Sequence, residues 1–117
     1  MIPLGSETKV FLALGFTDCR KAIDGLSILV SRHLALDPFS GHIFAFCNRK
    51  QTMIKLLLWE RNGFWLLQKR LERQRFRWPR SKDEVMELSF RELNWLLDGL
   101  DPLLLAGHKK LVYSTIY

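Results

Sequence analysis

The residues of this 117-residue sequence that are best suited to bind a ligand are cations concentrated between Lys69 and Arg80. Six of these twelve residues are basic and one is acidic, so the segment has a net charge of +5, against +6 for the whole chain. The basic residues are Lys69, Arg70, Arg73, Arg75, Arg77 and Arg80. The guanidinium group of arginine donates two parallel hydrogen bonds to a phosphate, which a lysine cannot do. The segment therefore favours binding to the phosphates of a nucleic acid.

The order of residues within this segment makes the prediction more specific. If residues 73–78 are extended, three arginines share one face, while Phe76 and Trp78 share the other. Side chains on one face are about 6.6–6.8 Å apart, comparable to the spacing of phosphates along a nucleic-acid strand. The aromatic residues would either anchor the segment in the core or stack on bases. A third interpretation is a solvated edge strand whose arginines prevent aggregation.

A second, smaller basic site is predicted at Arg20 and Lys21, near the expected start of a helix. The exposed N–H groups of a helix N-terminus, together with two cations, can hold a phosphate. The alternative is purely structural: Asp18 caps the helix, and Arg20 pairs with Asp24 one turn later.

The sequence contains no recognisable catalytic arrangement. Its carboxylates mostly lie beside cations or at expected helix ends, and it has no glycine-rich phosphate loop. Cys47 and His42 form a formal nucleophile and base pair, but neither belongs to a known motif. Cys19 and Cys47 are expected to be buried free thiols unless the fold brings their Cα atoms within about 7 Å, the limit for a disulfide. We therefore predict no enzymatic activity, no metal and no cofactor.

The periodicity of apolar residues predicts the elements that position the basic segment. A short apolar run predicts a buried strand over 10–14, and helical spacing follows from Asp18 to about 34. A three-stranded meander is expected from about residue 42 to 70, with a type I′ turn at Asn62-Gly63. Its aromatic strands could line a ligand pocket, although such strands more often form a core.

The remaining pattern predicts one more strand and one more helix. Residues 85–88 form the expected strand, and Ser89 with Glu92 has the spacing of a capping box before a helix that ends at Gly99. The predicted fold class is α+β: an antiparallel sheet of about four to five strands packed with two helices. We expect a single domain over 1–117, with a variable tail from about 102.

Charge and hydropathy indicate which partners and which cellular location to expect. The pI near 9.7 favours anionic partners. The N-terminus lacks the features of a signal peptide, and the longest apolar runs are far shorter than a membrane span. A cytoplasmic protein without a membrane partner is therefore expected.

Several segments of the chain match one known family in order. They are 17–26, 36–46, 48–49, 54–64, 69–72, 75–79, 87–89 and 96–101. In these segments the sequence resembles the TnpB-type accessory proteins of bacterial insertion-sequence family sixty-six, which are unrelated to the RNA-guided nuclease of the same name. The match covers about residues 10 to 101, and the departures are modest: Cys19 and Ala22 replace the Met and Gly that are common in relatives.

The resemblance implies an accessory role in DNA transposition, beside a separate transposase that carries the catalytic residues. The first hypothesis is a factor that binds DNA through the basic segment. The second is an adaptor that docks on the transposase, or on another protein of the element, without touching DNA. A third is RNA binding, since a sheet with aromatic residues can stack single-stranded bases.

Overall fold

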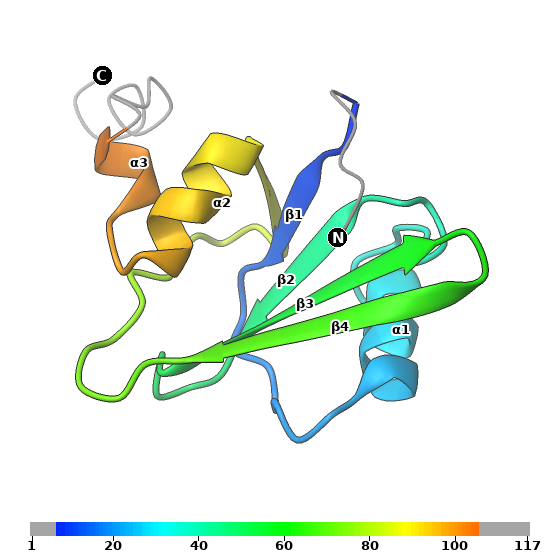
Figure 1. Cartoon of the computed structure of the whole chain (residues 1–117), viewed down its shortest axis with the longest axis horizontal. Coiled ribbons are helices and arrows are strands. Elements are labelled where there is room, and N and C mark those ends of the chain that lie inside the picture. The colour runs from blue at the N-terminus through cyan, green and yellow to red at the C-terminus, as the bar shows by residue number, and fades with distance from the viewer. Residues whose placement is uncertain (1–6, 106–117) are drawn as a thin grey trace.

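The computed structural model describes residues 7–105, which form a five-stranded sheet with helices on both faces (Figure 1). The strands are β1 (Val10–Ala13), β2 (Ile43–Cys47), β3 (Met53–Glu60), β4 (Gly63–Arg70) and β5 (Val85–Leu88). The helices are α1 (Ile23–Arg32), α2 (Phe90–Leu97) and the short α3 (Pro102–Leu105). The predicted α+β class is confirmed.

The strand order is β4-β3-β2-β1-β5, and all neighbours are antiparallel except β1 and β2. The expected sheet is therefore correct in strand number but contains one parallel pair. The reason is α1, which connects β1 to β2 and returns the chain to the end of the sheet where β1 began. As a result, β1 and β2 both end on the same side of the molecule.

Alternate residues of the strands supply two separate layers of core. Along β2, Ile43 and Cys47 contribute to the layer under α2, and Phe44 and Phe46 to the layer under α1. Each helix adds two fully buried residues to its layer: Leu26 and Val30 from α1, and Leu93 and Leu96 from α2. Every residue of β2 is buried, because the strand is central and both of its faces are covered.

The start of α1 differs from the sequence prediction. The helix begins at Ile23 rather than just after Asp18, and its N-cap is Ala22, which makes no side-chain hydrogen bond. Asp18 does not cap the helix because its carboxylate accepts hydrogen bonds from the main chain and the guanidinium group of Arg20. The expected pairing of Arg20 with Asp24 is likewise replaced by this local pair.

The turn between β3 and β4 is shifted by one residue from its predicted position. Gly63 pairs with Glu60 in the ladder, so the two-residue loop is Arg61-Asn62. Arg61 has a φ of 56°, whereas neither Asn62 nor Gly63 has positive φ. The loop therefore begins one residue earlier in the chain than the Asn-Gly signal indicates.

The predicted second helix is confirmed in detail. The Ser89 hydroxyl accepts the N–H of Glu92 at 3.1 Å, and the Glu92 carboxylate accepts the N–H of Ser89 at 2.8 Å. Gly99 follows the helix with a φ of 84°. Of the expected variable tail, residues 102–105 form α3, and residues 106–117 lie outside the described part of the chain. Among the helices between residues 7 and 105, none is both long and apolar enough to cross a membrane.

Candidate nucleic-acid interface

The basic segment divides into the end of β4 and an irregular stretch that follows it. We call residues 71–80 the arginine arm. Its main chain is tied to the β2–β3 turn, because the N–H of Leu71 donates to the carbonyl of Thr52 at 2.8 Å and the N–H of Phe76 to that of Gln51 at 2.7 Å. The Gln51 side chain donates back to the carbonyl of Phe76 at 3.1 Å. The arm is therefore fixed in place without being a strand of the sheet.

The two aromatic residues of the arm are part of the core. Phe76 is 1% exposed and Trp78 is 4% exposed, and both pack in the layer under α2. The Trp78 indole N–H donates to the carbonyl of Ala13 at 3.2 Å. Of the interpretations left open by the sequence, the structure supports anchoring, because these rings are not accessible to bases. The edge-strand interpretation does not apply to the arm, which has no place in the strand order.

The arginines of the arm lie between and beside these anchors and are exposed. Within residues 7–105, neither an ion pair nor a hydrogen bond occupies the side chain of Arg73, Arg75 or Arg77. The guanidinium carbon of Arg80 lies 6.0 Å from the centroid of the Phe16 ring. Together these side chains border an open depression of about 870 Å³ between the arm and the region just after α2.

Lys69 and Arg70 have different surroundings from the arm. Both belong to β4. The Lys69 ammonium group donates to the carbonyl of Leu97 at 2.7 Å, at the C-terminal end of α2, where a cation also complements the helix dipole. Arg70 forms an ion pair with Glu72 at 3.1 Å. These two predicted site residues are therefore engaged within the protein itself.

The second predicted site, at Arg20 and Lys21, is not the helix N-terminus that the sequence indicated. Both residues lie in the turn before α1. Arg20 binds the Asp18 carboxylate at 2.8 Å, and this pairing holds the pKa of Asp18 well below its usual range. The charge of Arg20 is thus locally compensated, whereas the side chain of Lys21 is exposed.

The sheet topology brings additional cations to the same end of the molecule. The β1–α1 loop, the β2–β3 turn and the arm all lie at this end, because β1, β2 and β4 end there and β3 and β5 begin there. The turn carries Arg49 and Lys50, both exposed, which the sequence interpretation did not include. The predicted meander would have been the signal for them, because its first and third strands run in the same direction and therefore end at the same edge of the sheet. We call this surface the basic end.

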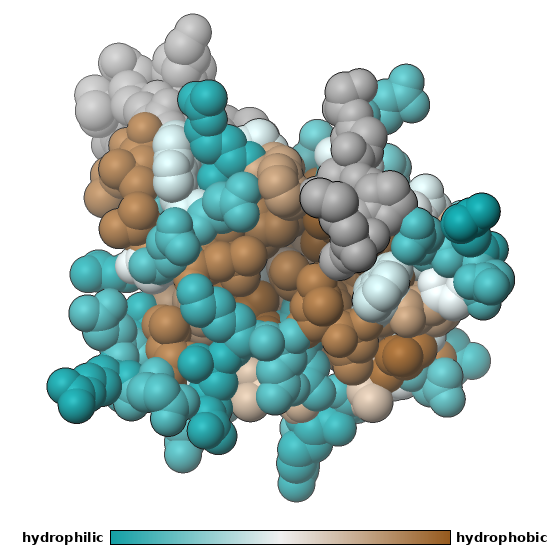
Figure 2. All heavy atoms as spheres, in the orientation of Figure 1, coloured by the Kyte–Doolittle hydropathy of each residue, from teal (hydrophilic) through white to brown (hydrophobic). Residues whose placement is uncertain are grey.

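The hydrophilic side chains near the arm project from the surface. Figure 2 shows them at the lower left, where Figure 1 places the segment that follows β4. The opposite end of the sheet carries the more dispersed cations Lys9, Arg32 and Arg61. The positive charge of the protein is therefore unevenly distributed along the strand direction.

The formal nucleophile pair is not assembled. His42 precedes β2 and Cys47 ends it, so the two residues lie at opposite ends of one strand, and the Nδ1 atom of His42 accepts the N–H of Lys9 at 3.0 Å. Both cysteines are free, Cys47 buried as expected and Cys19 only half-buried. Among residues 7–105, no group of three or more metal-ligating side chains is gathered.

Comparisons with known proteins address the family of the chain. The family model described as "IS66 Orf2 like protein" matches residues 8–105. Two proteins of Sinorhizobium fredii, uncharacterized protein y4hO and uncharacterized protein y4jC, are 35% and 32% identical over 101 residues. Each alignment covers 86% of this chain, and 88% and 86% of the respective relative. No solved structure matches significantly.

The matched region contains the arm, the β1–α1 loop and the β2–β3 turn, and thus the whole basic end. The resemblance inferred from the sequence is confirmed. Membership of this family suggests a transposition-associated accessory role, and the family is not a known catalytic one. The chain belongs to the IS66 Orf2-like family.

Proposed function

We propose that this protein is a non-catalytic accessory factor in transposition of a bacterial insertion sequence, and that it binds DNA through the arginine arm. The observation that carries the proposal is the arm itself: Arg73, Arg75 and Arg77 are exposed and unpaired within the described chain, while Phe76 and Trp78 fix the backbone that bears them. Family membership supplies the setting.

Anchoring favours binding because it reduces the entropy lost on association. A flexible basic tail must be ordered when it binds, whereas the backbone of the arm is already held by hydrogen bonds to Gln51 and Thr52. Only the arginine side chains lose freedom. The nearby cations Arg49 and Lys50 add to the attractive field for a polyanion.

The test compares two variants that lose the same charge at different places. In the arm variant, Arg73, Arg75 and Arg77 are changed to Gln. In the control variant, the three cations of the opposite end, Lys9, Arg32 and Arg61, are changed to Gln. Gel-shift titrations use insertion-sequence ends, random duplex DNA and RNA. We expect the arm variant to lose about tenfold or more in affinity for duplex DNA, and the control to lose much less.

Three outcomes would count against DNA binding by the arm. The first is equal weakening of both variants, which would indicate only a response to net charge. The second is absence of DNA binding by the unmodified protein at low salt. The third is a clear preference for RNA over both DNA duplexes, which would support the RNA hypothesis instead. Thermal unfolding of each variant verifies that the changes leave the fold intact.

A second candidate function is the protein adaptor, and one structural feature favours it. Trp65 and Leu67 on β4 are 41% and 40% exposed, and Leu104 of α3 is 66% exposed. Figure 2 shows apolar surface between the areas that Figure 1 assigns to α2 and β4. Co-purification with the transposase that survives nuclease treatment and high salt would favour this function. Loss of the complex under either treatment would favour DNA binding.

A further inference from the structure

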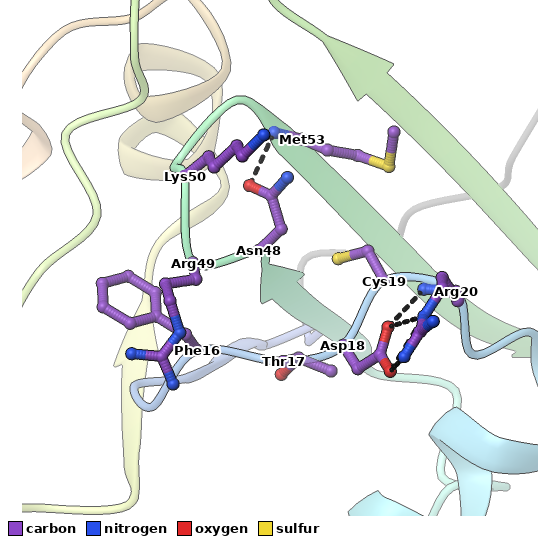
Figure 3. Close-up of a pocket in the computed structure, with 9 residues that line it drawn as sticks. All are labelled: Phe16, Thr17, Asp18, Cys19, Arg20, Asn48, Arg49, Lys50 and Met53. Atoms are coloured by element: carbon purple, nitrogen blue, oxygen red, sulfur yellow. Dashed lines mark hydrogen bonds and ion pairs between the residues drawn. The ribbon is translucent and has the colours of Figure 1, made fainter.

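A second binding feature lies beside the arm, in a cleft of about 730 Å³ at the ends of β1 and β2 (Figure 3). One wall is the β1–α1 loop, with Phe16 and the Asp18–Arg20 ion pair. The other wall is the β2–β3 turn, with Arg49 and Lys50. The cleft is thus formed where the parallel pair of strands ends, and its walls carry an aromatic ring and two cations without a local partner among the described residues.

Phe16 is exposed although the main chain on both sides of it is firmly held. The N–H of Leu14 donates to the carbonyl of Glu84 at 3.0 Å, and the N–H of Thr17 donates to the carbonyl of Cys47 at 2.8 Å. Leu14 and Thr17 are both buried, whereas Phe16 is 38% exposed. A large apolar ring held at the surface in this way offers a flat face to a ligand.

The charges around Phe16 favour a nucleotide over an apolar ligand. Arg80 of the arm lies over the Phe16 ring, and Arg49 and Lys50 line the same cleft. The turn that carries them is fixed by Asn48, whose side-chain oxygen accepts the N–H groups of Thr52 and Met53 at 2.9 and 3.1 Å. An aromatic face next to fixed cations is the arrangement with which proteins bind an unpaired base together with its phosphate.

We propose that this cleft binds one unpaired nucleotide of a DNA strand, with the base stacked on Phe16 and the phosphate on Arg49 and Lys50. This inference rests on the proposed DNA binding by the arm. Arg80 belongs to the arm and contacts Phe16, so a strand that follows the arm leads directly to the cleft. The protein would then prefer DNA with an unpaired end to a fully paired duplex.

The experiment measures binding of the full chain to two DNAs that differ only in a short single-stranded overhang. The unmodified protein is expected to bind the overhang DNA more tightly than the blunt duplex. Phe16→Ala should lose roughly 10- to 100-fold in affinity for the overhang DNA, the range typical of one base–aromatic stack, and should bind the blunt duplex as before. Phe16→Trp should retain the preference. The fluorescence of a 2-aminopurine base placed in the overhang should be quenched when the unmodified protein binds, and should not be quenched by the Phe16→Ala variant.

Phe39→Ala is the matched control, because Phe39 is also an exposed aromatic residue, at 56%, and lies at the opposite end of the sheet. It should leave the overhang preference unchanged. Two results would overturn the proposal while leaving DNA binding by the arm intact. The first is equal affinity of the unmodified protein for the overhang DNA and the blunt duplex. The second is a Phe16→Ala variant that loses the same affinity for both DNAs. If neither DNA binds, the proposed function itself fails. Should Phe16→Ala unfold, Phe16→Leu keeps the apolar volume without the aromatic face.

Discussion

Adjacent residues of the arginine arm have opposite surroundings, and this contrast defines their roles. Arg77 is exposed, whereas its neighbour Trp78 is buried and hydrogen-bonded to Ala13 on β1. Trp78 therefore stabilises the fold, and Arg77 is available for a ligand. Changes at the two positions should be separable in experiment, because one affects packing and the other affects charge.

Replacing Trp78 by Ala should lower the free energy of unfolding by about 3–5 kcal/mol, since it removes a large buried side chain. Trp78→Phe should cost less but leave the carbonyl of Ala13 without its donor. Arg77→Ala should stay within roughly 0.5 kcal/mol of the unmodified protein. Urea denaturation measures all three. Similar values for Trp78→Ala and Arg77→Ala would contradict the buried position of the indole.

A second prediction at this scale concerns Cys47. Burial raises the pKa of its thiol from the ordinary value of 9.0 to about 12, with a smaller contribution from Cys19. Between these values the folded protein retains a proton that the unfolded chain releases, so this contribution to stability falls as the pH rises above about 9.

The measurement is the free energy of unfolding of the unmodified protein and of Cys47→Ala between pH 8 and pH 10.5. The difference between the two free energies of unfolding should become smaller as the pH rises, by at most about 1.4 kcal/mol per pH unit. A difference that is constant over this range would show that the thiol is not protected in the fold.

At the scale of elements, α2 links the core to the basic end. Its buried residues cover the layer in which Phe76 and Trp78 are anchored, and its C-terminal carbonyl at Leu97 accepts the Lys69 ammonium group. Its start is stabilised by the Ser89–Glu92 capping box. The arm is therefore held in position partly by α2, and the capping box stabilises the N-terminal end of this helix.

Ser89→Ala removes the hydroxyl that accepts the N–H of Glu92, and should cost about 1 kcal/mol of stability. Ser89→Thr keeps an acceptor and should cost less. Thermal unfolding should therefore show a melting temperature that is several degrees lower for the Ala variant only. Equal melting temperatures for all three proteins would indicate that α2 does not need its cap.

At the scale of the whole molecule, exposed cations are concentrated at one of the two ends of the sheet along the strand direction. The β1–α1 loop, the β2–β3 turn and the arm are far apart in sequence but meet at one end of the sheet. The loop carries Arg20 and Lys21, and the turn carries Arg49 and Lys50. The Arg20 charge is compensated by Asp18 there, but the other cations named have no ion-pair partner within residues 7–105. Such an asymmetry orients a polyanionic partner before close contact.

The salt dependence of DNA binding measures this asymmetry. Each phosphate neutralised on duplex DNA contributes about −0.9 to the slope of log K against log salt concentration. Removing the three unpaired arm arginines should therefore make the slope shallower by roughly two to three units. The charge-matched variant at Lys9, Arg32 and Arg61 should keep nearly the original slope. Parallel lines for all three proteins would contradict phosphate contact by the arm.

The sequence by itself determined the features that arise from neighbours in the chain. Short apolar runs separated by turn residues predicted the central strands, and the spacing of Ser89 and Glu92 predicted the capping box. The order Arg75-Phe76-Arg77-Trp78 predicted alternating exposure. These patterns are readable because they depend on the local geometry of helices and extended chains.

The tertiary structure alone decided which distant groups meet. It placed Trp78 against β1 and paired β1 with β2 in parallel, and this parallel pairing brought the β1–α1 loop with Phe16 to the end of the sheet that carries the arm. It also directed Asp18 to Arg20 rather than to the start of α1. The physical reason is that strand order and long-range packing are set by the burial of apolar surface from the whole chain, which no local pattern of residues contains.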